Sequence, residues 1–101
     1  MSFSLSLAGK VAIVTGSGRE NGIGAAIALT LAQAGAQVTV NYVSDSSAPR
    51  AAEVVDKIEK AVGKGKVIVV QADVSTEAGA QKIVDQTLQQ FGVDHIDILG
   101  E

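Results

Sequence analysis

The chain contains no cysteine and no tryptophan, and aromatic residues make up only 3% of its 101 residues. Without cysteine there can be no disulfide, no thiolate nucleophile and no cysteine-ligated metal. So few aromatic rings also argue against a nucleic-acid surface that works by base stacking. A chain without cysteine fits a reducing compartment, so we expect a cytoplasmic protein.

Positive charge is scarce as well, with 8 Lys and Arg against 11 Asp and Glu, and a net charge of −3. This balance argues against nucleic acids or anionic membranes as partners attracted by bulk charge. No apolar run approaches the roughly 20 residues of a membrane span. Residues 1–7 lack the basic segment of a secretory signal. We therefore expect neither a nucleic-acid partner nor a membrane.

Short apolar, β-branched runs alternate with longer segments of helical periodicity. We expect strands at residues 11–15, 37–42, 67–72 and 96–99, and helices at residues 23–34, 48–62 and 76–91. The alternation predicts an α/β fold, an open parallel sheet of about four strands with helices on both faces. A Rossmann-like arrangement would give the strand order 3-2-1-4. Ser75 is a candidate N-cap for the third helix.

A glycine-rich segment joins the first expected strand to the first expected helix. Residues 15–24 read Thr-Gly-Ser-Gly-Arg-Glu-Asn-Gly-Ile-Gly. Glycine lets a ligand approach the backbone, and a helix N-terminus offers free N–H groups to a phosphate. The Gly-Lys-Ser/Thr of a P-loop does not follow. The segment predicts a dinucleotide-binding turn, and the simpler alternative is a tight turn with close helix–strand packing.

Residues 7–16, which read Leu-Ala-Gly-Lys-Val-Ala-Ile-Val-Thr-Gly, resemble the opening of a short-chain dehydrogenase/reductase. In that family Thr-Gly is followed by three residues and then Gly-x-Gly, whereas five residues separate Gly16 from Gly22 here. We interpret the difference as a two-residue insertion around Glu20 and Asn21; the alternative register starts at Gly18. Residues 73–74 and 91–99 extend the resemblance to about residues 5–99.

The resemblance implies a nicotinamide cofactor and, in a complete enzyme, hydride transfer between NADPH and a carbonyl or alcohol. It also implies that Asp73 meets the adenine, although a structural Asx-turn is the alternative for this residue. The cofactor-binding residues that we predict are Gly16, Ser17, Arg19, Gly22, Ile23, Gly24, Asn41, Tyr42, Ser44, Asp73 and Val74.

The end of the second strand bears on the choice of cofactor. An NAD enzyme usually places a carboxylate there for the ribose 2′-hydroxyl, but this chain has Asn41 and Tyr42. Arg19 could pair with a 2′-phosphate, with further hydrogen bonds from Asn41, Tyr42 and Ser44. Asp45 is unfavourable to phosphate, and Arg19 could instead be a solvated charge. We predict NADP, with NAD as the less favoured alternative.

The resemblance carries over no catalytic residue. Family members that reduce carbonyls have a Tyr-x-x-x-Lys pair, whereas Tyr42, the only tyrosine, is followed four residues later by Ser46. His95, Asp94 and Asp97 fit no acid–base or metal-site spacing, so we expect a surface histidine and no metal.

We therefore expect residues 1–101 to form one partial dinucleotide-binding domain, truncated before the catalytic segment. It would be the NADP(H)-binding portion of a short-chain oxidoreductase. The alternative is a non-catalytic protein that binds nucleotide or oligomerises. The expected strand order leaves the fourth strand at an edge, and an uncovered apolar edge tends to pair with another chain. We expect self-association through the strand from Ile96 to Leu99, or pairing with a complementary C-terminal chain.

Overall fold

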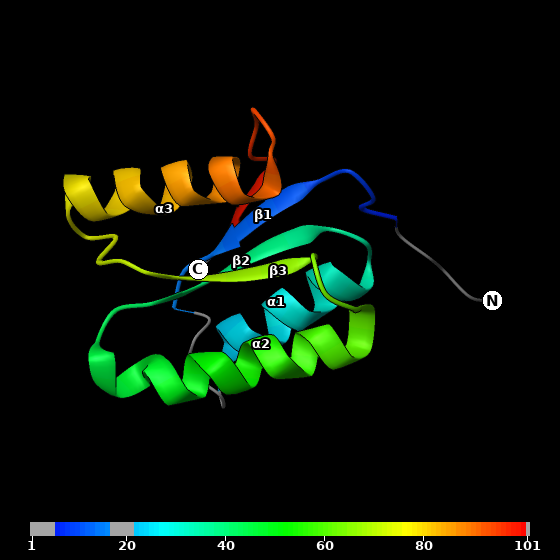
Figure 1. Ribbon diagram of the computed structural model, residues 1–101, viewed down its shortest axis with the longest axis horizontal. Coiled ribbons are helices and arrows are strands. Elements are labelled where there is room, and N and C mark those ends of the chain that lie inside the picture. Colours follow the sequence, from blue (N-terminus) through cyan, green and yellow to red (C-terminus); the bar gives the residue numbers. More distant parts are fainter. Residues whose placement is uncertain (1–5, 17–21, 101) are drawn as a thin grey trace.

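A computed structural model describes residues 6–16 and 22–100. Its elements alternate between strand and helix, as the sequence predicts (Figure 1). They are β1 (Val11–Val14), α1 (Ile23–Gln33), β2 (Gln37–Tyr42), the short 3-10 helix η1 (Asp45–Ser47), α2 (Ala48–Val62), β3 (Val67–Gln71), α3 (Glu77–Phe91) and β4 (Ile98–Gly100). The predicted α/β class is confirmed.

All four strands are parallel and lie in the order β3-β2-β1-β4. In the pairing of β1 with its two neighbours, Ala12 lies opposite Val38 of β2 and Ile98 of β4. The chain proceeds from β1 through β2 to β3 and then returns to add β4 on the other side of β1. The segment after β1 therefore leaves the sheet where the strand order reverses, the place at which open α/β sheets bind ligands. The predicted Rossmann-like order is confirmed.

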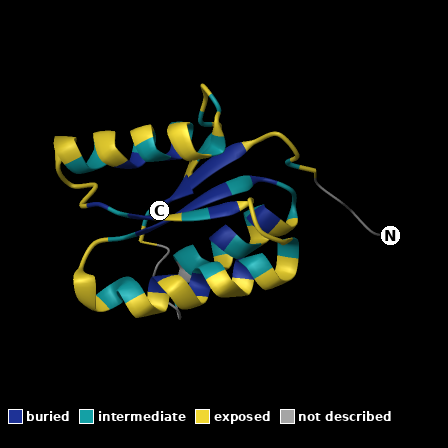
Figure 2. Cartoon of the chain, in the orientation of Figure 1, coloured by how far each residue is buried: buried dark blue, intermediate teal, exposed yellow. Residues whose placement is uncertain are grey.

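Helices α1 and α2 cover one face of the sheet and α3 covers the other (Figure 1). Successive strand residues point to opposite faces, so β1 contributes to both sides of the core. Ala12 and Val14 pack in the cluster with α1 and α2, whereas Ile13 packs with Ile83 of α3. Figure 2 shows the buried residues concentrated in the strands and on the inner sides of the helices.

A buried pair of hydroxyl groups joins β2 to α3. Thr39 and Thr87 are both fully buried, and their Oγ1 atoms lie 2.8 Å apart. The Thr87 hydroxyl donates to the carbonyl oxygen of Ile83 at 2.7 Å. Because a hydroxyl has one hydrogen, Thr39 must be the donor within the pair. Thr39 therefore marks the face of β2 that looks toward α3.

The bounds of β2 and α2 agree with the prediction, while β1, β3 and α1 each end one residue earlier than expected. The expected start of the fourth strand is wrong, because β4 begins at Ile98 and not at Ile96. Asp97 anchors the start of β1 instead: its Oδ2 accepts from the Val11 amide at 2.9 Å, and its own amide donates to the Val11 carbonyl at 2.8 Å.

The predicted N-cap of α3 is also wrong. Thr76 is the N-cap, and its Oγ1 accepts a hydrogen bond from the Gly79 amide at 3.0 Å. Ser75 bonds to Asp73 through its amide and its hydroxyl. The loop before α3 is thus stabilised by Asp73 and the helix by Thr76.

Candidate functional site

Parallel strands end at the same edge of a sheet, and this carboxyl edge holds the predicted site residues that the structure describes. They end β2, follow one of the first three strands, or lie at the start of α1, and they are Gly16, Gly22, Ile23, Gly24, Asn41, Tyr42, Ser44, Asp73 and Val74. Ser17 and Arg19, which were also predicted, lie outside the described residues.

Gly16 starts the turn that leaves β1. Its φ is +69°, a conformation that favours glycine, and a Cβ built there would meet nothing within 4 Å. Glycine is therefore favoured at position 16 by the positive φ of its backbone, and not by a lack of room for a side chain. Thr15, immediately before it, donates from both its amide (2.9 Å) and its hydroxyl (3.2 Å) to the carbonyl of Gly100 in β4.

The start of α1 suits a phosphate. Its N-cap is Gly22, in an extended conformation, and no side chain caps the helix there. The first-turn amides of a helix have no partner within the helix and carry the positive end of its dipole. α1 has no acidic residue in its first turn. An anion placed here would meet attractive groups and no opposing carboxylate from α1 itself.

Asn41 lies at the end of β2 and is fully buried. Its Oδ1 accepts a hydrogen bond from the Gly16 amide at 3.2 Å. Its Nδ2 donates to the carbonyls of Ala72 (3.0 Å) and Val70 (3.3 Å). The side chain thus faces protein groups at the ends of β1 and β3, and not the solvent side of the strand end where a 2′-phosphate was predicted to meet it.

The loop after β2 carries Tyr42 and Ser44. Tyr42 is half-buried, and its carbonyl accepts from the Ala72 amide at 3.0 Å. The exposed Ser44 hydroxyl lies 3.0 Å from that of Ser46 and 3.1 Å from that of Ser47. Three hydroxyl groups therefore gather where η1 begins.

Sequence reasoning missed Gln71, which fastens this loop. Its Nε2 donates to the Val43 carbonyl at 3.1 Å and to Oδ1 of Asp45 at 2.7 Å. The available signal was a polar residue directly after the apolar run of β3. Gln71 occupies one oxygen of Asp45, the acid judged unfavourable to a 2′-phosphate.

Asp73 follows β3 as an exposed carboxylate. Its Oδ1 accepts from the Ser75 hydroxyl at 2.6 Å and from the Ser75 amide at 3.0 Å. The bond from the Ser75 hydroxyl has the larger effect and the bond from the amide the smaller, and both hold the pKa of Asp73 below its ordinary value. The carboxylate is therefore charged at neutral pH. The Asx-turn that was the alternative for Asp73 is therefore present. It uses Oδ1 for both bonds.

Val74 lines a hollow of about 490 Å³ at the carboxyl edge. The hollow lies between the β1–β4 side of the sheet and the start of α3. Its walls are mostly apolar and come from Ile13, Thr15, Val74, Ala80, Ile83, Val84 and Leu99. Thr15 directly precedes the glycine turn, so this hollow adjoins the place where the predicted phosphate and adenine positions meet.

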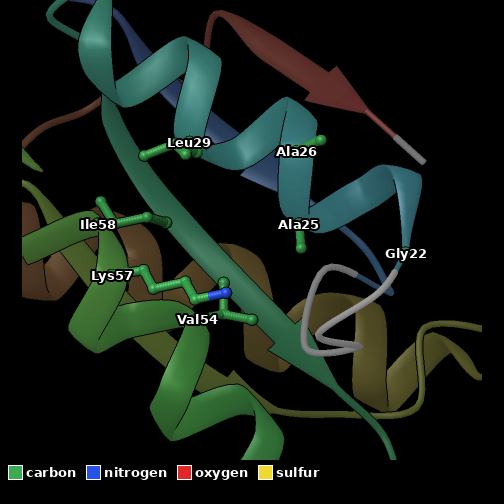
Figure 3. A pocket seen from close by; sticks show the side chains of 7 residues that line it. All are labelled: Gly22, Ala25, Ala26, Leu29, Val54, Lys57 and Ile58. Atoms are coloured by element: carbon green, nitrogen blue, oxygen red, sulfur yellow. The ribbon is translucent and has the colours of Figure 1, made fainter.

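A second hollow, of about 300 Å³, lies between α1 and α2. Figure 3 shows the aliphatic stem of Lys57 running past Val54, with Ala25 of α1 facing it. Among the described residues of the lining Lys57 is the only charged one, and the others are Gly22, Ala25, Ala26, Leu29, Val54 and Ile58. This hollow lies in the helical layer, and Gly22 is the one residue that it shares with the predicted site at the sheet edge.

His95 lies at the opposite, amino edge of the sheet. Its Nδ1 is 3.2 Å from Asp94 Oδ1, and its Nε2 is 3.1 Å from Asp97 Oδ2. The hydrogen bond to Asp94, then that to the Gly9 carbonyl and the charge of Asp97, raise the pKa of His95. Within residues 6–16 and 22–100, no three His, Cys, Asp or Glu residues are placed to hold a metal ion. No described helix is both long and apolar enough to cross a membrane.

Residues 10–101 match the family model described as short chain dehydrogenase. The chain belongs to the short-chain dehydrogenase family. It is 46% identical over 93 residues to versicolorin reductase stcU of Emericella nidulans, a match that covers 92% of this chain and 32% of the relative. The chain thus spans about a third of the length of the curated relatives that it matches.

Solved structures with a similar fold include complexes with a cofactor. A blue fluorescent protein from a metagenomic library, in complex with NADPH, has a TM-score of 0.78 and 41% identity, over 93% of this chain and 36% of that one. The Pseudomonas aeruginosa RhlG/NADP complex has a TM-score of 0.75 and 34% identity, over 98% of this chain and 35% of that one. Solved structures similar to this chain therefore include complexes with NADPH and with NADP.

Proposed function

We propose that the chain binds NADP(H) at the carboxyl edge of its sheet, as the cofactor-binding part of a short-chain oxidoreductase. One observation carries the proposal. The glycine-rich segment, residues 15–24, starts at the end of β1, where the strand order reverses, and connects β1 to α1 in the sequence. When bound in a complete enzyme, the cofactor would exchange a hydride with a carbonyl or alcohol substrate.

Each described part of this edge suits one part of the dinucleotide. The start of α1 at Gly22, Ile23 and Gly24 offers backbone amides to the pyrophosphate. Asp73, charged at neutral pH, offers an acceptor to the adenine amino group, and Val74 offers an apolar surface. This division follows the family resemblance and rests on the observed placement of these residues. It assigns no catalytic residue to the chain.

NADP is preferred over NAD in this proposal for two reasons. Neither residue 41 nor residue 42 is acidic, so no carboxylate occupies the end of β2 where it would repel a 2′-phosphate. Beyond Tyr42, the hydroxyl of Ser44 and its two serine neighbours supply exposed hydrogen-bonding groups. Arg19 would add a cation. The similar structures that hold NADPH and NADP support the same choice.

The experiment is a fluorescence titration with NADPH, compared with NADH. Asp73→Asn keeps the shape of the side chain but removes the charge. We expect its affinity to fall about threefold to tenfold, because Oδ1 is held by Ser75 and the free end of the side chain becomes an NH2 group, which cannot accept from the adenine amino group. Asp94→Asn makes the same change at the opposite edge and should have no effect. No binding by the wild type, or equal effects of the two variants, would contradict the proposal.

Self-association is a second proposal, and β4 is the observation that favours it. Within the described residues β4 is an edge strand that pairs only with β1, and the side chain of Leu99 is 72% exposed. An exposed edge offers unpaired backbone groups beside an apolar side chain, which suits pairing with a second copy.

A further inference from the structure

We propose that Asn41 is the positioning residue of the glycine turn: its buried amide fixes Gly16 and the end of β3 together and thereby sets nucleotide affinity without touching the nucleotide. This inference rests on the proposed function. It replaces the direct contact with a 2′-phosphate that the sequence predicted for Asn41. The hydrogen bonds of the Asn41 side chain lead to this change, because those at both ends of the amide go to backbone groups of the protein.

The two ends of the Asn41 amide face different kinds of partner. Oδ1 meets an N–H group, that of Gly16, at 3.2 Å. Nδ2 meets carbonyl oxygens, those of Ala72 at 3.0 Å and Val70 at 3.3 Å. A third carbonyl, that of Tyr42, also lies 3.3 Å from Nδ2. The partners fix both the orientation of the amide and the residue type, since a carboxylate would place an acceptor against three carbonyls and an apolar side chain would satisfy neither side.

Gly16 needs such a restraint. Its φ of +69° is one that glycine can exchange for a negative φ at little cost, and no atom fills the space where a Cβ would lie. Gly16 has no side chain through which packing could hold it. The hydrogen bond to Asn41 holds the backbone amide of Gly16 in place at the point where the turn begins. A turn held in place before binding loses less conformational freedom when the nucleotide arrives.

The same amide reaches the other half of the proposed site. The carbonyl of Ala72, which accepts from Nδ2, belongs to the peptide unit that leads into Asp73. One side chain therefore sets the spacing between the turn proposed for the phosphates and the loop proposed for the adenine. Loss of Asn41 should release both segments at once.

A purely structural role would also make Asn41 variants less stable, so a matched control is needed. Thr39 is two residues earlier on β2 and, by the alternation of the strand, on the same face. It is equally buried and is hydrogen-bonded to Thr87 at 2.8 Å, away from the proposed site. Thr39→Val removes a buried hydrogen bond from the same strand without altering Gly16 or Ala72.

The test measures NADP+ affinity by calorimetry and the hydrogen exchange of the Gly16 amide by NMR, for the wild type, Asn41→Ala and Thr39→Val. We expect Asn41→Ala to weaken binding about tenfold and to speed Gly16 exchange. Thr39→Val should change neither, even where the two variants lose similar stability. Asn41→Asp should bind better as the pH falls from 7 to 5, because a protonated carboxyl can again donate to Ala72.

The outcomes separate the two proposals. Wild-type chain that binds neither NADP+ nor NAD+ overturns the proposed function, and Gly16 exchange that is unchanged in Asn41→Ala overturns the role of Asn41. Equal losses of affinity in Asn41→Ala and Thr39→Val also overturn that role. If Asn41→Ala does not fold, Asn41→Asp decides: affinity that stays flat between pH 7 and pH 5 contradicts the inference.

Discussion

The backbone of Gly79, in the first turn of α3, lies against the carbonyl group of Asp73. A Cβ built on Gly79 would collide with the carbonyl oxygen and carbon of Asp73 and would lie 2.9 Å from Oγ1 of Thr76. Two of these three atoms are backbone and cannot turn away as the end of a flexible side chain could. Glycine at position 79 thus lets α3 begin directly beneath the loop that presents Asp73.

Gly79→Ala should therefore destabilise the chain by about 1–3 kcal/mol, the usual cost of forcing an extra carbon into a packed region. It should also weaken NADPH binding, because the Asp73 loop must move. Urea unfolding and the fluorescence titration measure the two effects. Gly100→Ala is the control, since a Cβ there meets nothing within 4 Å. Equal stability of the two variants would show that the close approach is not a constraint.

The buried hydroxyl pair predicts an asymmetry between two substitutions. Thr87→Val leaves the Thr39 hydroxyl as a buried donor without its partner, which costs about 1–3 kcal/mol. Thr39→Val leaves Thr87 still bonded to the Ile83 carbonyl, so the loss should be smaller, about 1 kcal/mol. The double variant should lose less than the sum. Urea unfolding of all three variants measures this, and equal single losses would refute the assigned direction of the bond.

His95 predicts a pH dependence of stability. Its pKa is raised in the folded chain, chiefly by Asp94, so the folded state binds the proton more tightly than the unfolded state. The resulting stabilisation is complete below the ordinary pKa of about 6.5 and is lost as the pH rises through the higher folded-state value. Unfolding free energies of the wild type and His95→Gln, measured from pH 5.5 to 9, should converge as the pH rises. A constant difference would contradict the prediction.

Asp45 predicts a change in cofactor choice. Its carboxylate lies in the loop after β2 and would repel the 2′-phosphate of the proposed cofactor, and Asp45→Asn keeps an oxygen for the bond from Gln71. We expect NADPH affinity to rise by up to about fivefold, as for an exposed charge pair, with NADH affinity unchanged. The gain should shrink at high salt. Asp94→Asn is the matched control. An equal gain in affinity for NADH, which has no 2′-phosphate, would contradict a position of the 2′-phosphate beside Asp45.

The exposed side chain of Leu99 leads to a prediction about which strand edge mediates self-association. Leu99→Lys puts a charge on the β4 edge, which natural proteins use to block edge pairing. The variant should be monomeric in light scattering at concentrations where the wild type is larger. Val69→Lys makes the same change on β3, the other edge, where Val69 is also exposed, and should leave the association intact. A wild type that stays monomeric at high concentration refutes this route.

Much of the fold could be predicted from the sequence because the strands and helices carry strong local signals. The apolar, β-branched run from Val11 to Val14 is buried on both faces, as the central strand of such a sheet must be. The strand order followed from the alternation of elements and the family resemblance. The start of β4 was harder to predict, because Asp97 forms side-chain and backbone bonds with Val11, and these depend on tertiary contact.

The candidate site was predicted less completely. Residue types indicated which side chains follow the strands, but not where each one points. Asn41 looked like a ligand for phosphate, and its burial became visible only when β1 and β3 were placed on either side of β2. Gln71 was missed for the same reason, since its two partners lie 26 and 28 residues away in the sequence. Side-chain hydrogen bonds between segments far apart in the sequence cannot be predicted from the local pattern of apolar and polar residues.

An NMR titration of the backbone amides with NADPH tests the central claim most directly. The account predicts saturable shifts at the carboxyl edge, at Gly16, Gly22 and Gly24, at Tyr42 and Ser44, and at Asp73 and Val74. It predicts no shifts at Asp94 and His95 on the amino edge. Shifts confined to the helix residues that line the hollow between α1 and α2, such as Leu29, Val54 and Lys57, or no saturable shift at millimolar NADPH, would contradict the account.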